Sequence, residues 1–324
     1  MSYVQTKNLL TACAFAAVSL IAQSQANAVE LNFGVIAIDT STALRSAWEP
    51  ITADWSNCTG YTIKPFFAVD YAGVIEGMRF NKVQVGWFGN LAAMEAVDRS
   101  NGEIFAKTVR MDGSEGYNSL LVTNKESPYN NLSDFVKHTK EINFGIGDPN
   151  STSGTLVPSY YVFAKYNINP KTDFKSIRSA NHATNLMAAA MKQVDVATNN
   201  TEDWERAEKN KPEIIKELKI IWKSPLIPAD PFVYRADLPA DQKAKLKSCI
   251  IGYTTGADAA DHKEKLAKVV ASGILPSTND QLKPIRQIAL FTEMTKVEND
   301  TTIDAAEKQK KIAVIKEKLA LLDK

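Results

Sequence analysis

The residues best suited to binding chemistry are four small residues in a row, Ser151, Thr152, Ser153 and Gly154, inside "NFGIGDPNSTSGTLVPSYYVFAKY". An apolar strand pattern precedes them and an aromatic helix pattern follows, so they lie where a helix begins. Free N–H groups at a helix start lie at the positive end of its dipole, and three hydroxyls would add neutral donors. Such a turn suits a tetrahedral oxyanion, but a helix cap whose hydroxyls face water fits the same pattern. Pro158, about one turn later, would delay or kink the helix.

Further polar side chains stand beside predicted strand ends or crossings. They are Tyr71 in "VDYAGVIEGM", Tyr117 in "GSEGYNSL", His182 in "SANHATNLM", Glu202 in "NNTEDW" and Asp230 between two prolines. Each also has an ordinary structural explanation. Tyrosines usually pack, a histidine is often a satisfied core residue, an acid at a helix start stabilises the dipole, and a turn aspartate is usually solvated. The residues alone leave both interpretations open.

The sequence carries none of the local patterns of nucleotide, metal or nucleophilic chemistry. The patterns GxxxxGK[ST], HExxH, CxxC and GxSxG are missing, and "GIGDPN" has Asn150 where a dinucleotide loop has its third glycine. His182 would serve as a base for Ser151 or Ser153 in a hydrolase, yet no nucleophile elbow surrounds either serine. We therefore predict no catalytic residue, no cofactor and no metal site, and the protein is not predicted to be an enzyme.

Length and composition indicate an ordinary globular protein. The chain has 324 residues, of which 44% are hydrophobic and 23% are charged, enough for one large domain or two smaller ones. Its 38 basic residues almost balance 37 acidic ones, and no basic stripe stands out before the lysine-rich C-terminus. This balance argues against a nucleic-acid-binding protein.

Residues 1–28 have the three-part pattern of a cleavable signal peptide. A lysine is followed by an apolar run and then by "ANA", and the run is too short for a comfortable membrane span. We expect export and a soluble mature protein in the periplasm. Cleavage would leave two cysteines, Cys58 and Cys249, which either pair in the oxidising compartment or remain separate buried thiols. Their spacing does not decide between these alternatives.

Strand-like and helix-like segments alternate after the signal. The segments "LNFGVIAI", "YTIKPFFA" and "VQVGWFG" are predicted strands, each followed by a helical pattern, and "EINFGIG", "FKSIRSA" and "VDVATNN" repeat the scheme. Strands that alternate with short helices form crossover units, so we predict an α/β fold with mainly parallel sheets.

Two extended stretches rich in proline or asparagine divide the chain into two lobes. They cover residues 116–135 and 218–239, and the second contains four prolines. We predict a first lobe from residues 29–118 and 232–324 and a second lobe from residues 119–231, with the two extended crossings as a hinge. A cleft between two lobes favours a ligand site.

An amphipathic helix is predicted from Thr302 onward. Ile312, Ile315, Leu319 and Leu322 share one face, and lysines lie elsewhere. This face would pack on a lobe or on a partner subunit, and the second arrangement would give a homodimer through the C-terminal helices.

Five long, ungapped stretches run along nearly the whole mature chain: "FAVDYAGVIEGMRFNKVQVGWFGNLAAMEAVDR", "GDPNSTSGTLVPSYYVFAK", "KQVDVATNNTE", "IWKSPLIPADP" and "PIRQIALFTEM". They resemble the periplasmic phosphonate-binding proteins of bacterial ABC-type phosphonate uptake systems, of the type that binds 2-aminoethylphosphonate. The resemblance implies the two-lobed periplasmic binding protein fold, type II-like, which closes its cleft on a ligand. It also implies a receptor that delivers a small phosphonate to an ABC permease driven by an ATPase.

The resemblance further implies a role for each candidate residue. The residues it assigns to the phosphonate group are Tyr71, Tyr117, Ser151, Thr152, Ser153 and His182. Those it assigns to an amino group are the carboxylates of Glu202 and Asp230. All these positions carry the family residue, whereas their neighbours Asn181, Ala183 and Ala229 depart from the family pattern and would alter the shape of the pocket.

The paired carboxylates select among ligands. Two buried carboxylates that face one cavity repel each other unless a cation joins them. A primary ammonium offers three donors, and each charge-assisted bond contributes about 1.5–3 kcal/mol. Glu202 and Asp230 would thus favour zwitterionic 2-aminoethylphosphonate. A receptor for phosphite, phosphate or a simple alkylphosphonate is the alternative within transport, and a phosphonate or phosphate-ester hydrolase is the alternative from another class.

Overall fold

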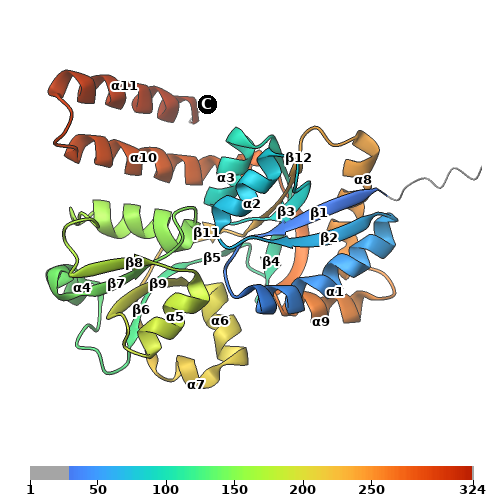
Figure 1. Ribbon diagram of the computed structural model, residues 1–324, viewed down its shortest axis with the longest axis horizontal. Helices are drawn as coiled ribbons and strands as arrows, with labels where there is room; N and C mark the ends of the chain where they lie inside the picture. Colours follow the sequence, from blue (N-terminus) through green and yellow to red (C-terminus); the bar gives the residue numbers. More distant parts are fainter. Residues whose placement is uncertain (1–28, 323–324) are drawn as a thin grey trace, which may run out of the picture.

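The computed structural model describes residues 29–322, which form two α/β lobes and a C-terminal helical hairpin (Figure 1). Each lobe is built around one large sheet with helices packed against it. The α/β class and the two-lobed architecture predicted from the sequence are therefore confirmed. The predicted signal peptide lies outside the described residues. None of the helices in residues 29–322 has the length and apolar character needed to cross a membrane.

The first lobe contains a six-stranded sheet in the order β13-β4-β12-β3-β1-β2. Its strands are β1 (Glu30–Val35), β2 (Thr62–Phe67), β3 (Val85–Trp87), β4 (Gly102–Arg110), β12 (Pro231–Arg235) and β13 (Ala271–Pro276). Its helices are α1 (Ser41–Thr59), α2 (Tyr71–Arg79), α3 (Asn90–Arg99), α8 (Ala240–Ile251) and α9 (Ala259–Ala267), with short 3₁₀ turns at Gly252–Thr254 and Asn279–Leu282. The predicted strand–helix alternation is thus present from β1 to α3.

The second lobe contains a five-stranded sheet in the order β10-β6-β9-β7-β8. Its strands are β6 (Ser119–Asn124), β7 (Asn143–Ile146), β8 (Ser176–Ser179), β9 (Val196–Asn200) and β10 (Leu218–Lys223). Its helices are α4 (Leu132–Lys137), α5 (His182–Ala190), α6 (Thr201–Asn210) and α7 (Pro212–Ile215), with a 3₁₀ turn at Thr139–Glu141 and π-helical segments η2 (Thr152–Leu156) and η3 (Ser159–Ala164). The second half of the predicted alternation is present here.

Both sheets are mixed, which corrects the prediction of mainly parallel sheets. Strands β1, β2 and β3 run parallel, as do β7, β8 and β9. The strands next to the crossings are antiparallel to their neighbours. Strand β12 is antiparallel to β3 and β4, and β6 is antiparallel to β9 and β10. A strand that reaches a sheet from the other lobe needs no crossover helix, so nothing forces it to be parallel.

Two extended crossings join the lobes. Within them β5 (Gly116–Tyr117) and β11 (Ile227–Pro228) pair as a short antiparallel ladder between the large sheets (Figure 1). Both strands lie inside the stretches that the sequence marked as crossings. The lobe boundaries after residues 118 and 231 stay a prediction.

Each lobe has its own aromatic core. In the first, Trp48 and Trp55 on one face of α1 pack on Phe33 of β1 and Phe232 of β12, with ring centroids 5.1–6.4 Å apart. In the second, the rings around Phe144 of β7 fill one side of the sheet.

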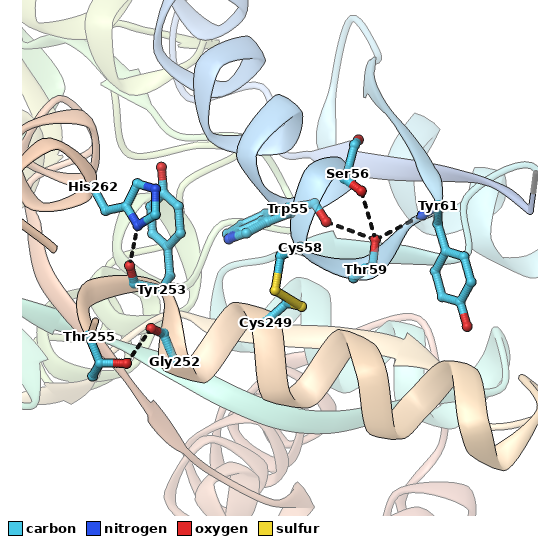
Figure 2. The surroundings of a disulfide bond; sticks show 10 residues. All are labelled: Trp55, Ser56, Cys58, Thr59, Tyr61, Cys249, Gly252, Tyr253, Thr255 and His262. Carbon is cyan, nitrogen blue, oxygen red and sulfur yellow. Dashed lines mark hydrogen bonds between the residues drawn. A yellow bond between two sulfur atoms is a disulfide. The ribbon is translucent and has the colours of Figure 1, made fainter. Parts of the chain in front are cut away.

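A disulfide between Cys58 and Cys249 fastens α1 to α8 (Figure 2). The two Cα atoms are 5.9 Å apart although the residues are separated by 191 positions in the sequence. Of the two alternatives that the spacing left open, the structure therefore contains the paired one. The bond ties the two segments of the first lobe together within that lobe.

The C-terminal hairpin consists of α10 (Lys283–Asn299) and α11 (Ala305–Leu322). Helix α10 passes from the first lobe over the second, where the ring of Phe291 lies 6.0 Å from that of Tyr160. Helix α11 lies outside α10 (Figure 1) and turns Ile315 of its predicted apolar face inward. This face packs on α10, and the homodimer stays a prediction.

Candidate functional site

A small cavity lies between the lobes, at the carboxyl ends of the parallel strands. Such edges of α/β sheets are where ligands usually bind. The first lobe contributes the segments after β1, β2 and β3, and the second contributes those after β7, β8 and β9. The lining residues are Ile36, Ile38, Tyr71, Trp87, Gly89, Tyr117, Ser151, Thr152, Ser153, His182, Asn200, Glu202, Asp203, Arg206 and Asp230. Every residue that the sequence singled out as a ligand contact lines this cavity.

The hydroxyl turn between β7 and η2 is both a helix cap and a buried surface. Ser151 is the N-cap residue, and its Oγ accepts a hydrogen bond from Gly154 N at 3.0 Å. The side chains of all three hydroxyl residues are buried, so the alternative in which they face water is wrong. A Cβ on Gly154 would lie 2.9 Å from the Cα of Gly147, so glycine lets the helix start approach the strand end. Pro158 separates the π-helical segments η2 and η3, in agreement with the predicted disturbance there.

The oxygen of each hydroxyl in this turn already accepts a hydrogen bond. Besides Ser151, Thr152 Oγ1 accepts from Leu91 N across the cleft at 2.8 Å, and Ser153 Oγ accepts from Asn200 Nδ2 at 3.1 Å. A hydroxyl has one hydrogen to donate. Because these oxygens are engaged as acceptors, the three O–H groups can donate to other partners, and His182 Nε2 is within reach of Ser151 and Ser153.

His182 adds a neutral imidazole to the same end of the cavity. It begins α5 directly after β8, where Asn181 caps the helix, and its Nε2 lies 3.3 Å from Ser151 Oγ and 3.4 Å from Ser153 Oγ. Burial lowers the pKa of His182 to about 4, so the ring is uncharged at neutral pH. Its Nδ1 has no hydrogen-bond partner within residues 29–322. A weak base that no carboxylate orients is a poor activator of serine, which argues against the hydrolase.

Two buried tyrosines reach the cavity from outside the hydroxyl turn. Tyr71 begins α2, where Asp70 caps the helix, and its backbone N–H donates to Asp148 across the cleft at 3.2 Å. Tyr117 lies on β5 in the first crossing. Burial, followed by the charge of Asp230, raises the pKa of both phenols well above the usual value. Both rings therefore remain neutral hydrogen-bond donors.

The opposite end of the cavity holds the two carboxylates. Glu202 lies in the first turn of α6, which Asn200 caps at the end of β9, and Asp230 lies between β11 and β12. Burial raises the pKa of Glu202 to about 7, against the opposing charge of Arg110. Burial and then the charge of Glu202 raise the pKa of Asp230 well above its usual value. Asp230 Oδ1 has no hydrogen-bond partner within the described chain. Without a cation beside them, the two carboxyls thus take up protons more readily than exposed acids do.

Arg110 is the charged neighbour that the sequence did not reveal. It ends β4, an element that no predicted segment covered, and its Nη1 lies 3.5 Å from Glu202 Oε1. Trp87 and Asn200 also line the cavity without having been singled out. The only feature of the sequence that could have indicated these two residues is their position at the ends of strands β3 and β9.

Contacts between the lobes close the cavity. Besides the bond from Leu91 to Thr152, Ala183 N donates to Ile38 O at 3.3 Å, and Arg206 Nε lies 3.9 Å from Asp39 Oδ2. Beyond Arg206 a larger cavity of about 620 Å³ opens between the same lobes. None of the predicted ligand contacts lines it, so we regard it as the approach to the site.

One group in the described chain has the composition of a metal site, and it lies near the disulfide. Asp54, Asp261 and His262 bring three ligand-type atoms together. However, Lys265 Nζ lies 2.7 Å from a carboxylate oxygen of each aspartate. The lysine ammonium already supplies the cation, so the group is explained as an ion-pair cluster, with His262 stacked on Tyr253 (Figure 2).

Comparisons with known proteins identify relatives of the chain. A sequence model of the family described as "ABC transporter, phosphonate, periplasmic substrate-binding protein" matches residues 33–282. The chain is 48% identical over 294 residues to the phosphonates-binding periplasmic protein of Escherichia coli (strain K12), covering 91% of this chain and 86% of the relative.

Solved structures extend the likeness to three dimensions. The binding protein component of an ABC phosphonate transporter from Pseudomonas aeruginosa has a TM-score of 0.88 and 50% identity, over 92% of this chain and 97% of that one. PhnD1 of Prochlorococcus marinus (MIT 9301), solved with methylphosphonate, has a TM-score of 0.72 at 22% identity, over 82% and 98% of the two chains. This second likeness shows the shared fold alone.

The relatives are transport proteins that bind a substrate and are not enzymes, which confirms the prediction that no reaction is catalysed. The family implies a periplasmic location and ABC transporter components as partners. The chain belongs to the family of periplasmic phosphonate-binding proteins of ABC transporters.

Proposed function

We propose that this phosphonate-binding protein is a receptor for 2-aminoethylphosphonate, which it captures by closing its lobes. The phosphonate group would lie against the hydroxyls of Ser151, Thr152 and Ser153. The ammonium group would lie between Glu202 and Asp230. The remaining donors to the phosphonate oxygens would be His182, Tyr71 and Tyr117.

The carboxylate pair is the observation that carries the proposal. Asp230 is 4% exposed, and its Oδ1 has no hydrogen-bond partner within residues 29–322. Leaving a buried acceptor unsatisfied costs about 1–3 kcal/mol, so a donor is expected to fill this position. A primary ammonium supplies both the charge and several donors at once. A ligand that brings its own cation therefore completes the acidic end of the cavity.

The other end of the cavity is suited to the phosphonate. Its donors are hydroxyls, phenols and a neutral imidazole, and the turn adds the N–H groups of a helix start. Neutral donors that already face inward bind an oxyanion without a lysine or arginine beside it. The charge distribution along the cavity is thus complementary to that of the zwitterionic ligand.

The alternative is a receptor for phosphite, phosphate or a simple alkylphosphonate. These anions fit the hydroxyl end equally well. They would leave Glu202 and Asp230 to share protons, because no group on the ligand would pair with them. The PhnD1 structure with methylphosphonate is only 22% identical to this chain, so its ligand does not decide the question.

Lobe closure links binding to transport. The phosphonate end lies mainly on the second lobe, whereas Tyr71 and Asp230 approach from the first lobe and the crossing. Only the closed arrangement brings both sets to one ligand, so closure would be the state that the permease recognises.

Titration calorimetry with a matched panel tests the proposal. 2-Aminoethylphosphonate should bind in a 1:1 ratio and about 100-fold more tightly than ethylphosphonate or methylphosphonate at pH 7.5, since one charge-assisted pair is worth about 1.5–3 kcal/mol. Ethylphosphonate is the matched control because it lacks only the amine. Equal affinities would remove the proposed preference and favour the alternative receptor. Recovery of unchanged ligand after incubation would separate a receptor from a hydrolase.

A further inference from the structure

Arg110 is a buried cation behind the acidic end of the cavity. Its side chain is 4% exposed, and its Nη1 lies 3.5 Å from Glu202 Oε1. Its Nη2 pairs with Glu205 at the edge of the site. Nη1 itself has no hydrogen-bond partner within the described residues. A guanidinium keeps its charge at any working pH, so a permanent positive charge lies beside Glu202.

The backbone holds Arg110 against the segment that carries Asp230. Thr108 and Arg110 are two positions apart on β4 and therefore share one face of the strand. The N–H and hydroxyl of Thr108 both donate to Asp230 O, at 3.1 and 3.4 Å. On the other side of β4, Ser272 Oγ of β13 donates to Arg110 O at 2.6 Å and holds the end of β4 in place. Glu202 comes from the second lobe, so its contact with Arg110 joins the two lobes across the cleft.

The charges that face Glu202 come from three elements. They are Arg110 on β4, Asp230 before β12, and Glu205 and Arg206 on α6. Glu205 is 42% exposed, and Arg206 is paired with acids of its own. With exposed Glu205 and the Arg206–Asp203 pair set aside, the set consists of two carboxylates and one guanidinium, with a net charge of −1 when both carboxyls are ionised. One ammonium group would bring that set to neutrality.

We infer that Arg110 is a specificity-determining residue: it leaves the acidic end of the cavity with a single net negative charge, which matches a ligand that carries one ammonium group. The inference rests on the proposed function, since it concerns the same site. Arg110 is a positioning residue, because it acts on the ligand through Glu202 and Asp230. Without it the two carboxylates would hold their protons more tightly, and the ammonium would have to displace them.

If Arg110 had only a structural role, the expected effect of its loss on ligand affinity would be different. As a link between the lobes through Glu202 and Glu205, it would stabilise closure around every ligand alike. Its loss would then weaken aminated and non-aminated phosphonates by the same factor at every pH. The ratio of the two affinities in the variant, compared with the same ratio in wild type at each pH, separates the roles because the ionisation of each free ligand is the same for both proteins.

The experiment compares wild type, Arg110→Met, Arg110→Lys and the control Arg286→Met, which breaks a surface pair with Asp98. Affinities for 2-aminoethylphosphonate and ethylphosphonate are measured by calorimetry from pH 6 to pH 9. In Arg110→Met we expect the preference for the aminated ligand to fall at least tenfold at pH 7 and to recover toward pH 9. Arg110→Lys and Arg286→Met should keep the wild-type profile, and thermal melts should confirm that each variant is folded.

The outcomes distinguish a role of Arg110 in specificity from a role in closure, and both from a failure of the proposed function. A preference that Arg110→Met leaves unchanged at every pH overturns the role of Arg110, and equal weakening of both ligands assigns it to closure alone. If wild type shows no preference for the amine, the proposed function fails first, whatever Arg110 does. If Arg110→Met does not fold, the Arg110→Lys profile still decides: a preference lost despite the retained charge contradicts the inference.

Discussion

Replacing Glu202 with glutamine is the sharpest perturbation of the proposed ligand geometry. Glutamine keeps the shape and the hydrogen-bonding capacity of the side chain but removes its charge. Glu202 lies in the first turn of α6 with its side chain 13% exposed, and α6 itself is capped by Asn200, so the substitution should leave the backbone in place. Arg110 keeps its pairing with Glu205.

The magnitude follows from the contacts at the acidic end. 2-Aminoethylphosphonate would lose one charge-assisted bond, worth about 1.5–3 kcal/mol, which corresponds to roughly a 10- to 150-fold weaker affinity. Ethylphosphonate has no group that reaches Glu202. Since the pKa of Glu202 is about 7, protonating this carboxyl costs little at neutral pH, and the affinity for ethylphosphonate should change less than about threefold.

Calorimetry on the purified variant, with both ligands, is the assay. Glu208→Gln is the matched control, because Glu208 is exposed on the same helix and does not line the cavity. Equal weakening of both ligands by Glu202→Gln would refute the reasoning, since it would show that Glu202 supports closure and does not hold the amine. A melting temperature close to that of wild type would exclude unfolding as the cause.

Three further predictions concern pH, the phosphonate end and the disulfide. The pKa of Glu202 is raised to about 7 and an ammonium favours the ionised form. The affinity for 2-aminoethylphosphonate relative to ethylphosphonate, each corrected for ionisation of the free ligand, should therefore rise as pH increases through about 7 and fall below it. Calorimetry in buffers of different ionisation enthalpy should detect proton release on binding. His182→Phe keeps a buried ring but removes the donor, so both phosphonates should bind about 5- to 10-fold more weakly with an unchanged ratio in the same titrations. Loss of the Cys58–Cys249 bond in the double serine variant should lower the free energy of unfolding by about 2–5 kcal/mol and the melting temperature by roughly 5–15 °C. Ligand affinity should change less than about threefold. An unchanged melting curve would contradict a stabilising role for the disulfide.

Local features of the sequence were enough to place the hydroxyl turn at a helix start. A strand, a turn with three hydroxyls and a helix start are contiguous, so Ser151, Thr152 and Ser153 could be placed at a helix N-terminus from the pattern alone. The remaining contacts come from separate strand ends. Their convergence followed from the family resemblance and from the rule that parallel strands end at one edge of a sheet.

Long-range pairing limited what could be predicted. Arg110 is 92 residues before Glu202 in the sequence, and nothing local to it indicates a ligand site. The antiparallel placement of β4 and β12 depends on which strand each one meets after a crossing, and a segment's own periodicity carries no such information. The pairing of Cys58 with Cys249 is of the same kind, because 191 positions of sequence separate them.

A crystal structure of the protein with 2-aminoethylphosphonate tests the central claim most directly. The account predicts the ligand nitrogen within hydrogen-bond distance of both Glu202 and Asp230 and the phosphonate oxygens against the hydroxyl turn. A ligand bound in the reverse orientation, or an ammonium that touches neither carboxylate, would contradict it.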